Sequence, residues 1–320
     1  MEHSRFQAGT TLIELMVALA IGTFLMIGAI TVFMQGRTTF RVSESLARLQ
    51  ENGRFALDAL EADVRMAQYW GLTNRPELVG GRASEAPIST AGGLSACGAN
   101  WVIDLDNAIA GSNNRYAWDC PAPNADAGSD TLVVRRVAEN ASTVSEVNAA
   151  PAGTLFVRSV RGGIDGQIFS GAAPRGFDRV TQALNQLVVN GYYVHTHSTT
   201  LGATVPSLRM KTLVAGGTIE DREVLPGVEN IQIQFGIDTD PPGAVNRGAI
   251  DRYVNADDPL LAGSGILAVR VWLRIRAEHI ENGFTDTVTY NYADENAGPF
   301  HDAFRRIVVS KTIYLRNAHF

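Results

Sequence analysis

The sequence predicts an α+β protein, in which a long N-terminal helix spans a membrane, continues as a stalk and packs on a mainly antiparallel β-sheet head. Three observations predict this fold class. An apolar run begins near residue 10, and an amphipathic helical pattern follows it. From about residue 131 the hydrophobic period changes to about two, and few helical intervals separate the strand-like segments.

The apolar run continues to Met34 and contains Glu14 as its one charged residue. A helix of roughly 23 apolar residues is long enough to cross the hydrocarbon core of a bilayer. A carboxylate inside that core is unfavourable unless it finds a partner, so Glu14 is a candidate functional residue. The alternative is a plain membrane anchor whose Glu14 reaches toward the lipid headgroups.

A short leader, Met1 to Gly9, precedes the apolar run. A secretory signal places its cleavage site after the apolar core, whereas here the small residue Gly9 comes before it. The arrangement resembles the signal of type IV prepilins and pseudopilins, which a prepilin peptidase cuts after the Gly before methylating the new N-terminus. The resemblance implies cleavage between Gly9 and Thr10, although Thr10 stands where the family usually has Phe.

Composition and charge narrow the function classes. The formal net charge of −6 over 320 residues argues against broad nucleic-acid binding, although Arg270, Arg274 and Arg276 lie close together in the sequence. The two cysteines, Cys97 and Cys120, favour one disulfide in an exported chain. Such a bridge would contribute roughly 3 kcal/mol through the loop that it closes. We expect the aromatic residues near these cysteines to pack on the disulfide as a small satellite core.

Residues 37–71 follow a helical period, with apolar residues on one stripe and alternating charges on the rest. Gly53 lies on the apolar stripe, where close packing would explain it, and Gly71 is a natural end of the helix. The stretches Glu51–Leu57, Asp63–Ala67 and Tyr69–Gly71 resemble the stalks of PilW-type minor pilins and of related J-type pseudopilins.

The remaining chain reads as turn-rich loops and then strands, which we expect at residues 131–137, 155–160, 187–195, 208–214, 228–238, 266–276, 284–292 and 306–315. Asn190-Gly191 indicates either a hairpin turn or a bulge. We therefore divide the chain into a leader (1–9), a membrane helix (10–36), a stalk helix (37–71), a variable loop and β region with the disulfide (72–185) and an antiparallel β region (186–320).

Two C-terminal stretches extend the resemblance to the PilW family. Residues 225–240 are similar to its central strand and acidic turn, and residues 269–276 and 305–317 are similar to its final strands. The resemblance implies a pilin-like fold and a minor pilin of a type IV pilus, acting in assembly initiation and located at the fibre tip. Two alternatives remain, a J-type pseudopilin of type II secretion and a pilus-borne adhesin or ligand-binding module.

The resemblance also implies partners, location and site residues. The partners would be other minor pilins, the major pilin, the prepilin peptidase and the inner-membrane assembly platform. The precursor would cross the inner membrane once with its head in the periplasm, and the mature protein would join an extracellular pilus. Gly9 and Thr10 would form the processing junction, and Glu14 would accept the N-terminal amine of Thr10 of a neighbouring subunit.

No catalytic motif or cofactor-binding motif is recognisable in the sequence, so we do not expect an enzyme. Asp238, Asp240 and Asp251 gather oxygen ligands of the kind that calcium prefers. Pro241 and Pro242 stand where a ligand and a flexible link would help, and the sequence therefore favours a solvated acidic turn over a calcium site. His195 and His197 lack an obvious third ligand and are expected to be polar surface.

Overall fold

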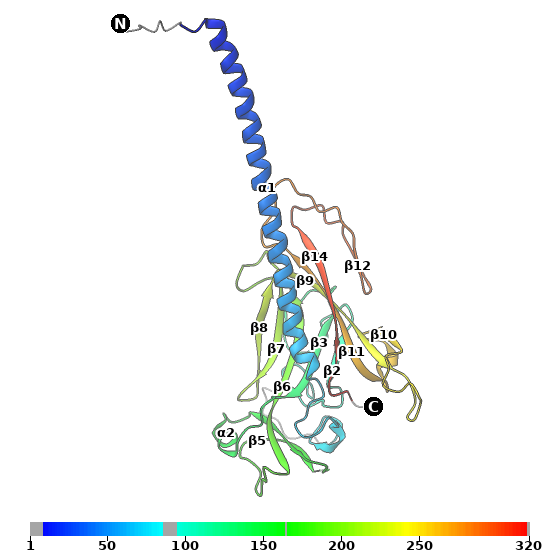
Figure 1. Cartoon of the computed structure of the whole chain (residues 1–320). Helices are drawn as coiled ribbons and strands as arrows, with labels where there is room; N and C mark the ends of the chain where they lie inside the picture. Colours follow the sequence, from blue (N-terminus) through cyan, green and yellow to red (C-terminus); the bar gives the residue numbers. More distant parts are fainter. Residues whose placement is uncertain (1–8, 86–94, 164, 319–320) are drawn as a thin grey trace, which may run out of the picture. The chain divides into compact units, whose positions relative to one another are not determined.

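The structure is a computed structural model that describes residues 9–85, 95–163 and 165–318. It confirms the predicted α+β class, with one long N-terminal helix and a head of mostly antiparallel strands (Figure 1). The chain divides into two compact units, Met1–Arg48 and Leu49–Phe320. Most of the predicted leader, residues 1–8, lies outside the described residues.

Helix α1, Leu12–Arg65, contains the predicted apolar run. Its most apolar window has a mean hydropathy of 2.4 and none of it is buried in the structure, so by length and composition the helix can cross a membrane. The hydroxyl groups within the run are satisfied locally, since Thr23 donates to the carbonyl of Leu19 at 2.7 Å and Thr31 to that of Ile27 at 2.8 Å.

The last part of α1 buries the apolar stripe that the sequence predicts. The buried residues recur three or four positions apart and are Leu49, Gly53, Ala56, Leu57, Leu60, Asp63 and Val64. The helix ends at Arg65 rather than at Gly71, because Gln68 adopts a left-handed backbone with φ of 64°. This earlier turn carries Trp70 into the core, where it is fully buried.

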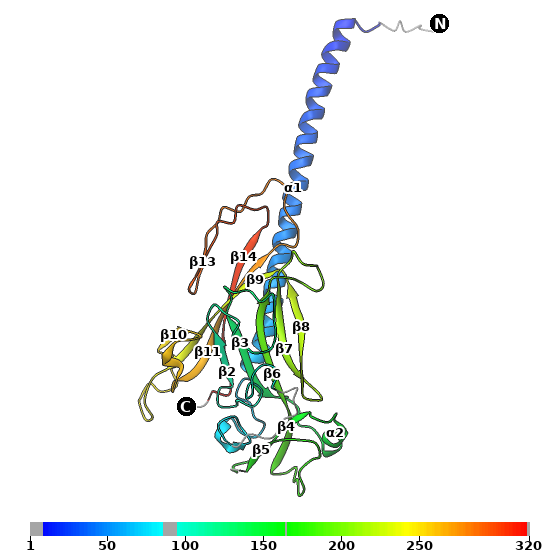
Figure 2. The ribbon, with the colours of Figure 1, turned by 180° about the vertical axis from the view of Figure 1, so that it is seen from behind.

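An eight-stranded sheet forms one part of the head. Its strands are β1 (Val79–Gly80), β2 (Ile109–Ser112), β3 (Thr131–Val137), β4 (Leu155–Val160), β5 (Gly166–Ser170), β6 (Gln182–His195), β7 (Ser207–Val214) and β8 (Thr218–Pro226). Only β1 and β5 pair in parallel among these described strands. The short helix α2, Val144–Ala149, lies between β3 and β4 in the chain. Figure 2 shows β2, β3, β6, β7 and β8 side by side, with the C-terminal part of α1 behind them.

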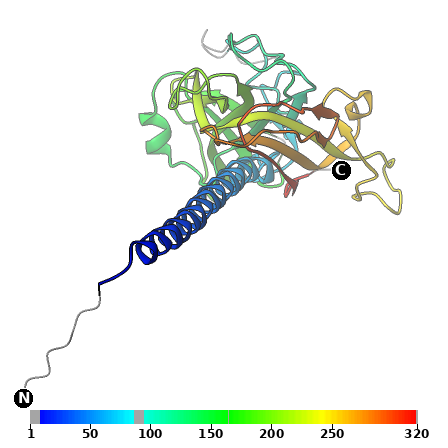
Figure 3. The ribbon, with the colours of Figure 1, turned by 90° about the horizontal axis from the view of Figure 1, so that it is seen from above.

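A second sheet of four antiparallel strands has the order β10-β9-β11-β14 (Figure 3, yellow to red). Its strands are β9 (Val228–Asp238), β10 (Arg252–Asn255), β11 (Gly265–Arg276) and β14 (Arg306–Tyr314). A separate hairpin is formed by β12 (Tyr290–Tyr292) and β13 (Glu295–Ala297). The strand predicted at residues 284–292 is therefore confined to its last three residues. The earlier part is held at the buried Asp286, whose backbone bonds Asp302 and His301 and whose carboxylate accepts from Arg306 at 2.9 Å.

Two large hydrophobic clusters fill most of the described head, and a small third one is formed by Val147, Phe156 and Leu184. The larger joins the buried stripe of α1 to both sheets, including Leu132 of β3 and Val271 of β11. The second surrounds the disulfide and includes Trp70, Trp101 and Val189. Both clusters lie within residues 49–320, so this unit has its own core.

Asn190-Gly191 is neither a turn nor a bulge but lies inside β6, which pairs with β3 on one side and with β7 on the other. The reason for the glycine is a close approach of two indole rings. A Cβ atom at Gly191 would lie 2.7 Å from Trp118 and 2.8 Å from Trp101. Gly191 therefore makes room for the aromatic residues that pack beside the disulfide.

Candidate functional site

Glu14 lies in the first turn of α1 and is bound by the residue that caps the helix. The backbone N–H and the hydroxyl of Thr11 both donate to Glu14 Oε2 at 2.9 Å, and the N–H of Glu14 donates to the Thr11 hydroxyl at 3.4 Å. This is a capping box, which fixes the start of the helix. The second oxygen, Oε1, has no hydrogen bond with any described residue, so one side of the carboxylate is free to accept a donor.

The role of Thr11 was not predicted from the sequence. The signal was present, because a Thr followed three residues later by Glu at the start of an apolar run is the pattern of a capping box. The consequence is that Glu14 has a fixed position even on an exposed helix surface. The carboxylate is held by one oxygen and presents the other.

The surface around Glu14 is apolar and open. A shallow hollow there is lined by Ile13, Glu14, Val17, Ala18 and Ile21. The large side chains along this part of α1 are strongly exposed, with Leu12 at 80% and Phe24 at 79%. Gly22 and Gly28 have no atom within 4 Å of a built Cβ. A surface of this kind needs lipid or another apolar helix as its environment, and the small residues allow close approach.

The predicted processing junction precedes the helix. Gly9 and Thr10 are both exposed and lie outside regular secondary structure, while α1 begins at Leu12. The Gly9–Thr10 peptide bond is therefore reachable in a non-helical segment. A cut there would leave a new amine close to the start of α1, four residues before Glu14.

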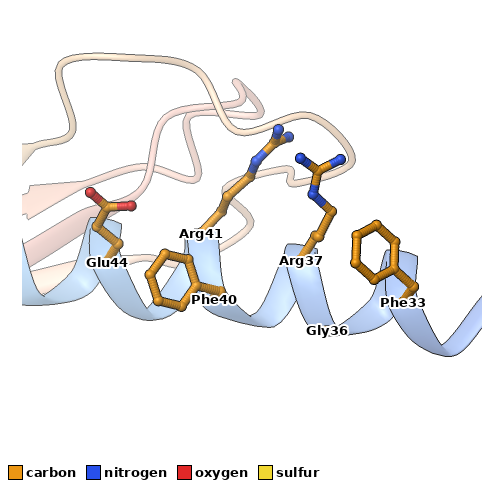
Figure 4. Close-up of a pocket in the computed structure, with 6 residues that line it drawn as sticks. All are labelled: Phe33, Gly36, Arg37, Phe40, Arg41 and Glu44. Atoms are coloured by element: carbon orange, nitrogen blue, oxygen red, sulfur yellow. The ribbon is translucent and has the colours of Figure 1, made fainter.

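A second hollow on α1 marks the far end of the apolar run (Figure 4). It is lined by Phe33, Gly36, Arg37, Phe40, Arg41 and Glu44. The Arg37 guanidinium lies 5.3 Å from the centre of the Phe33 ring. Aromatic and basic side chains commonly anchor a membrane helix at the lipid–water interface, and these are the first charged residues after Glu14.

The disulfide between Cys97 and Cys120 is formed, as predicted, with an S–S distance of 2.05 Å. Both cysteines are buried in the second cluster with Trp101, and Trp118 packs against it. The phenol of Tyr116 donates to the carbonyl of Cys120 at 2.8 Å. The predicted satellite core is therefore present and continuous with the sheet.

The acidic turn brings Asp238, Asp240 and Asp251 together, with carboxylate oxygens within 4.8 Å of one another. Backbone N–H groups already serve two of them. Asp238 accepts from Asp240 and from Gly248, and Asp251 accepts from Thr239 at 2.7 Å. The backbone N–H and then the hydroxyl of Thr239 lower the pKa of Asp251. Asp240 Oδ2 is buried without a described partner, but one such atom in a half-exposed residue does not make a cation site.

His195 ends strand β6, and His197 follows in a bend with the two ring centres 5.7 Å apart. His195 Nδ1 accepts a hydrogen bond from the backbone N–H of His197 at 3.0 Å. No acidic or cysteine side chain joins the two rings in a ligand set among the described residues. The pair is a local turn feature.

Comparisons with known proteins agree with these features. Residues 191–317 match the family model of the type IV pilus-assembly protein W (PilW). Residues 4–30 match the prokaryotic N-terminal methylation motif. No curated protein sequence matches the chain significantly.

A type IV-like pilin from Thermus thermophilus is similar in structure, with 13% identity and a TM-score of 0.30 over 66% of this chain and 82% of that chain. That likeness is too distant to support a conclusion by itself. The PilW match begins inside β6 and covers β7 to β14, and the methylation motif covers the predicted processing junction and Glu14. The chain thus combines a PilW domain over residues 191–317 with a prokaryotic N-terminal methylation motif over residues 4–30, the combination expected of a type IV pilin-like protein.

Proposed function

We propose that this protein takes part in initiating type IV pilus assembly and is located at the fibre tip. The observation that carries the assembly role is the free oxygen of Glu14 on an open apolar helix surface, directly after a methylation motif. Cleavage after Gly9 would expose the charged amine of Thr10. In an apolar environment a lone carboxylate is unfavourable, so pairing with the amine of a neighbouring subunit would select one docking register.

The same features also suggest the path of the protein from membrane precursor to pilus subunit. The prepilin peptidase would cut a precursor that crosses the inner membrane once with its head in the periplasm. The disulfide supports an oxidising compartment for the head. The mature protein would then join other minor pilins and the major pilin through the assembly platform and become part of the extracellular pilus.

A J-type pseudopilin of type II secretion is the second candidate, because it would use the same junction and the same carboxylate. The match of residues 191–317 to the pilus-assembly family favours the pilus. Deletion of the gene, followed by separate assays of piliation and of protein secretion, distinguishes the two. Loss of secretion with normal pili would contradict the proposed function.

The assembly role of Glu14 is tested with Glu14→Ala in the full chain. We expect the variant to be inserted and processed normally but to co-purify with other pilins at least about tenfold less, because the subunit amine loses its partner. Glu44→Ala is the matched control, since Glu44 lies on the same helix in an exposed pair with Arg48. Equal recovery of partners with Glu14→Ala and Glu44→Ala would refute the pairing.

Processing is tested in the same experiment with Gly9→Ala. The added methyl group should block leader removal, which leaves a larger precursor on a gel and an N-terminal sequence that starts at Met1. A mature N-terminus at Thr10 in this variant would contradict the proposed junction.

A further inference from the structure

The four-stranded sheet has a polar outer face that the helix does not cover. Along β11, Val269, Val271 and Leu273 belong to the core cluster with α1, whereas Arg270 and Trp272 alternate with them on the other face. The ladder places Arg270 between Gln234 of β9 and Thr312 of β14, and Trp272 between Gln232 and Ser310.

The arginine side chains on this face differ in their partners. Arg274 and Arg276 both lie within salt-bridge distance of Glu229, at 3.3 and 3.6 Å. Arg306 pairs with Glu229, Asp286 and Asp302. Arg270 has no acidic partner among the residues that the structure describes. The arginine cluster seen in the sequence is thus mostly neutralised, and Arg270 alone is left as a cation for a ligand.

Arg270 is nevertheless held in one position. Its guanidinium carbon lies 3.8 Å from the centre of the Tyr253 ring, and its Nε donates to the Thr312 hydroxyl at 3.2 Å. The Tyr253 ring has room because its partner on the neighbouring strand β9 is Gly236, where a Cβ atom would lie 3.0 Å from the ring. The two terminal nitrogens make no hydrogen bond to a described residue and are not buried, so they form a preorganised fork.

Trp272 supplies an apolar surface beside this fork. The Arg270 guanidinium lies 5.7 Å from the Trp272 ring centre. The indole is partly exposed, and its N–H has no hydrogen bond within the described ranges and is not buried. Its neighbour on the edge strand β14 is the small and exposed Ser310, so the flank of the ring is open. The Thr312 hydroxyl and the amides of Gln234 and Asn255 lie around the same area. The Gln234 amide donates to the Asn255 carbonyl at 3.1 Å, and the Asn255 amide donates to the Asp294 carboxylate at 3.0 Å.

We propose that this face binds an acidic carbohydrate of the uronic acid class. The carboxylate would accept two hydrogen bonds from the Arg270 fork, and the apolar C–H face of the sugar ring would pack on Trp272. The surrounding hydroxyl and amide groups would bind the sugar hydroxyls. The binding function goes beyond the proposed role in assembly and does not depend on it.

An extended acidic peptide fits this face less well. The backbone groups of β9 and β11 are paired on both sides in the ladder, so an added strand cannot bind them here. Recognition must therefore come from side chains, and a sugar offers many hydroxyl groups over a small flat area. One cation, one aromatic ring and several neighbouring polar groups correspond to the carboxylate, the apolar face and the hydroxyl groups of an acidic sugar.

The test uses the full chain in detergent micelles, with a galacturonic acid hexamer as the probe and its methyl ester as the neutral control. Calorimetric titration should show binding of the hexamer and at least about tenfold weaker binding of the ester, because the charge-assisted bonds are lost. Arg270→Gln should lose a similar factor for the hexamer, while Trp272→Ala should weaken both sugars and Trp272→Phe should restore part of the affinity.

Arg252→Gln is the matched control variant. Arg252 is an exposed arginine on the neighbouring strand β10, and its register with Ile237 places it on the opposite face of the sheet. The proposal is overturned if the hexamer does not bind at about 1 mM, or if the ester binds equally well. It is also overturned if an oligoglutamate of the same charge binds equally tightly through Arg270, which would indicate an acidic peptide as the ligand.

Discussion

Asp130 is a carboxylate that is fully buried where loop 113–130 meets strand β9, with no cationic partner among the described residues. Burial raises its pKa to about 7, although the backbone N–H groups of Asn114 and Ile233 oppose the shift, and the charges of Asp294 and Asp257 add to it. The folded state therefore holds a proton that the unfolded state has already released above its ordinary pKa of 3.8. Stability must fall as the pH rises between these two values.

The first prediction is that the free energy of unfolding decreases between pH 5 and pH 8 in the wild type and not in Asp130→Asn. At about 1.4 kcal/mol per pH unit, the full effect from pH 4 to pH 7 is about 4 kcal/mol. Thermal unfolding of both proteins at pH 5 and at pH 8 measures the part of this effect that falls in that window. Asp178→Asn is the control, because the exposed Asp178 has a pKa that Val180 and Thr181 lower, outside this window. Parallel pH curves for wild type and Asp130→Asn would rule out the assignment.

Asp63 is a residue whose role could not be predicted from the sequence. The sequence places this carboxylate on the stalk helix, but its partners are far along the chain. Arg136 donates to it at 2.7 Å and the phenol of Tyr192 at 2.6 Å, and the amide of Asn190 also binds it. A buried carboxylate with three such partners fastens α1 to β3 and β6. No local period encodes contacts across 73 or more positions, so they could not be predicted.

The strands of the head were predictable where their two faces differ. β9, β11 and β14 alternate or are continuously apolar, and the sequence predicts them with nearly correct ends. β8 was missed because the charged run from Glu220 to Glu223 interrupts its period, although Ile219, Val224 and Leu225 at its ends pack against the core. An edge strand needs no apolar face, and its charges discourage pairing with other chains. A strand produces a hydrophobic pattern in the sequence only where its side chains are buried, and none of the side chains of β8 is fully buried.

Gly53 of α1 was predicted to mark close packing, and the structure gives the contacts. A Cβ atom at this position would lie 3.0 Å from Val309 of β14 and 3.1 Å from Ile275 of β11. The helix thus approaches the four-stranded sheet so closely that a side chain at Gly53 would have to displace Val309 or Ile275. The gain in helix propensity that a larger residue brings, up to about 1 kcal/mol, is smaller than the cost of overpacking.

We predict that Gly53→Leu lowers the free energy of unfolding by about 2 kcal/mol or more. Gly36→Leu on the same helix is the matched control, because no atom lies within 4 Å of a built Cβ there. It should leave the melting temperature unchanged or raise it slightly. Thermal melts of both variants in the same detergent measure the difference. Equal melting temperatures would mean that the contact between α1 and the sheet is loose.

In the whole molecule, the two units differ in whether they contribute to the hydrophobic core. The residues of α1 that are buried in the structure begin at Leu49, and both hydrophobic clusters draw only on residues from there onward. The exposed apolar residues between Leu12 and Met34 contribute nothing to that core. The head is therefore expected to fold without the membrane segment, whereas the last turns of α1 are part of its interior.

The last prediction follows from this division. A chain of residues 44–320 retains the Glu44–Arg48 pair and the whole buried stripe, and it should be soluble with a melting temperature within a few degrees of the full chain in detergent. A chain of residues 66–320 lacks the stripe and Asp63, which leaves the partly buried Arg136 without its carboxylate and opens the larger core. We expect this chain to show no cooperative melt by circular dichroism. A folded 66–320 chain would mean that the sheets close without the helix, and an unfolded 44–320 chain would mean that the membrane segment helps to hold the head.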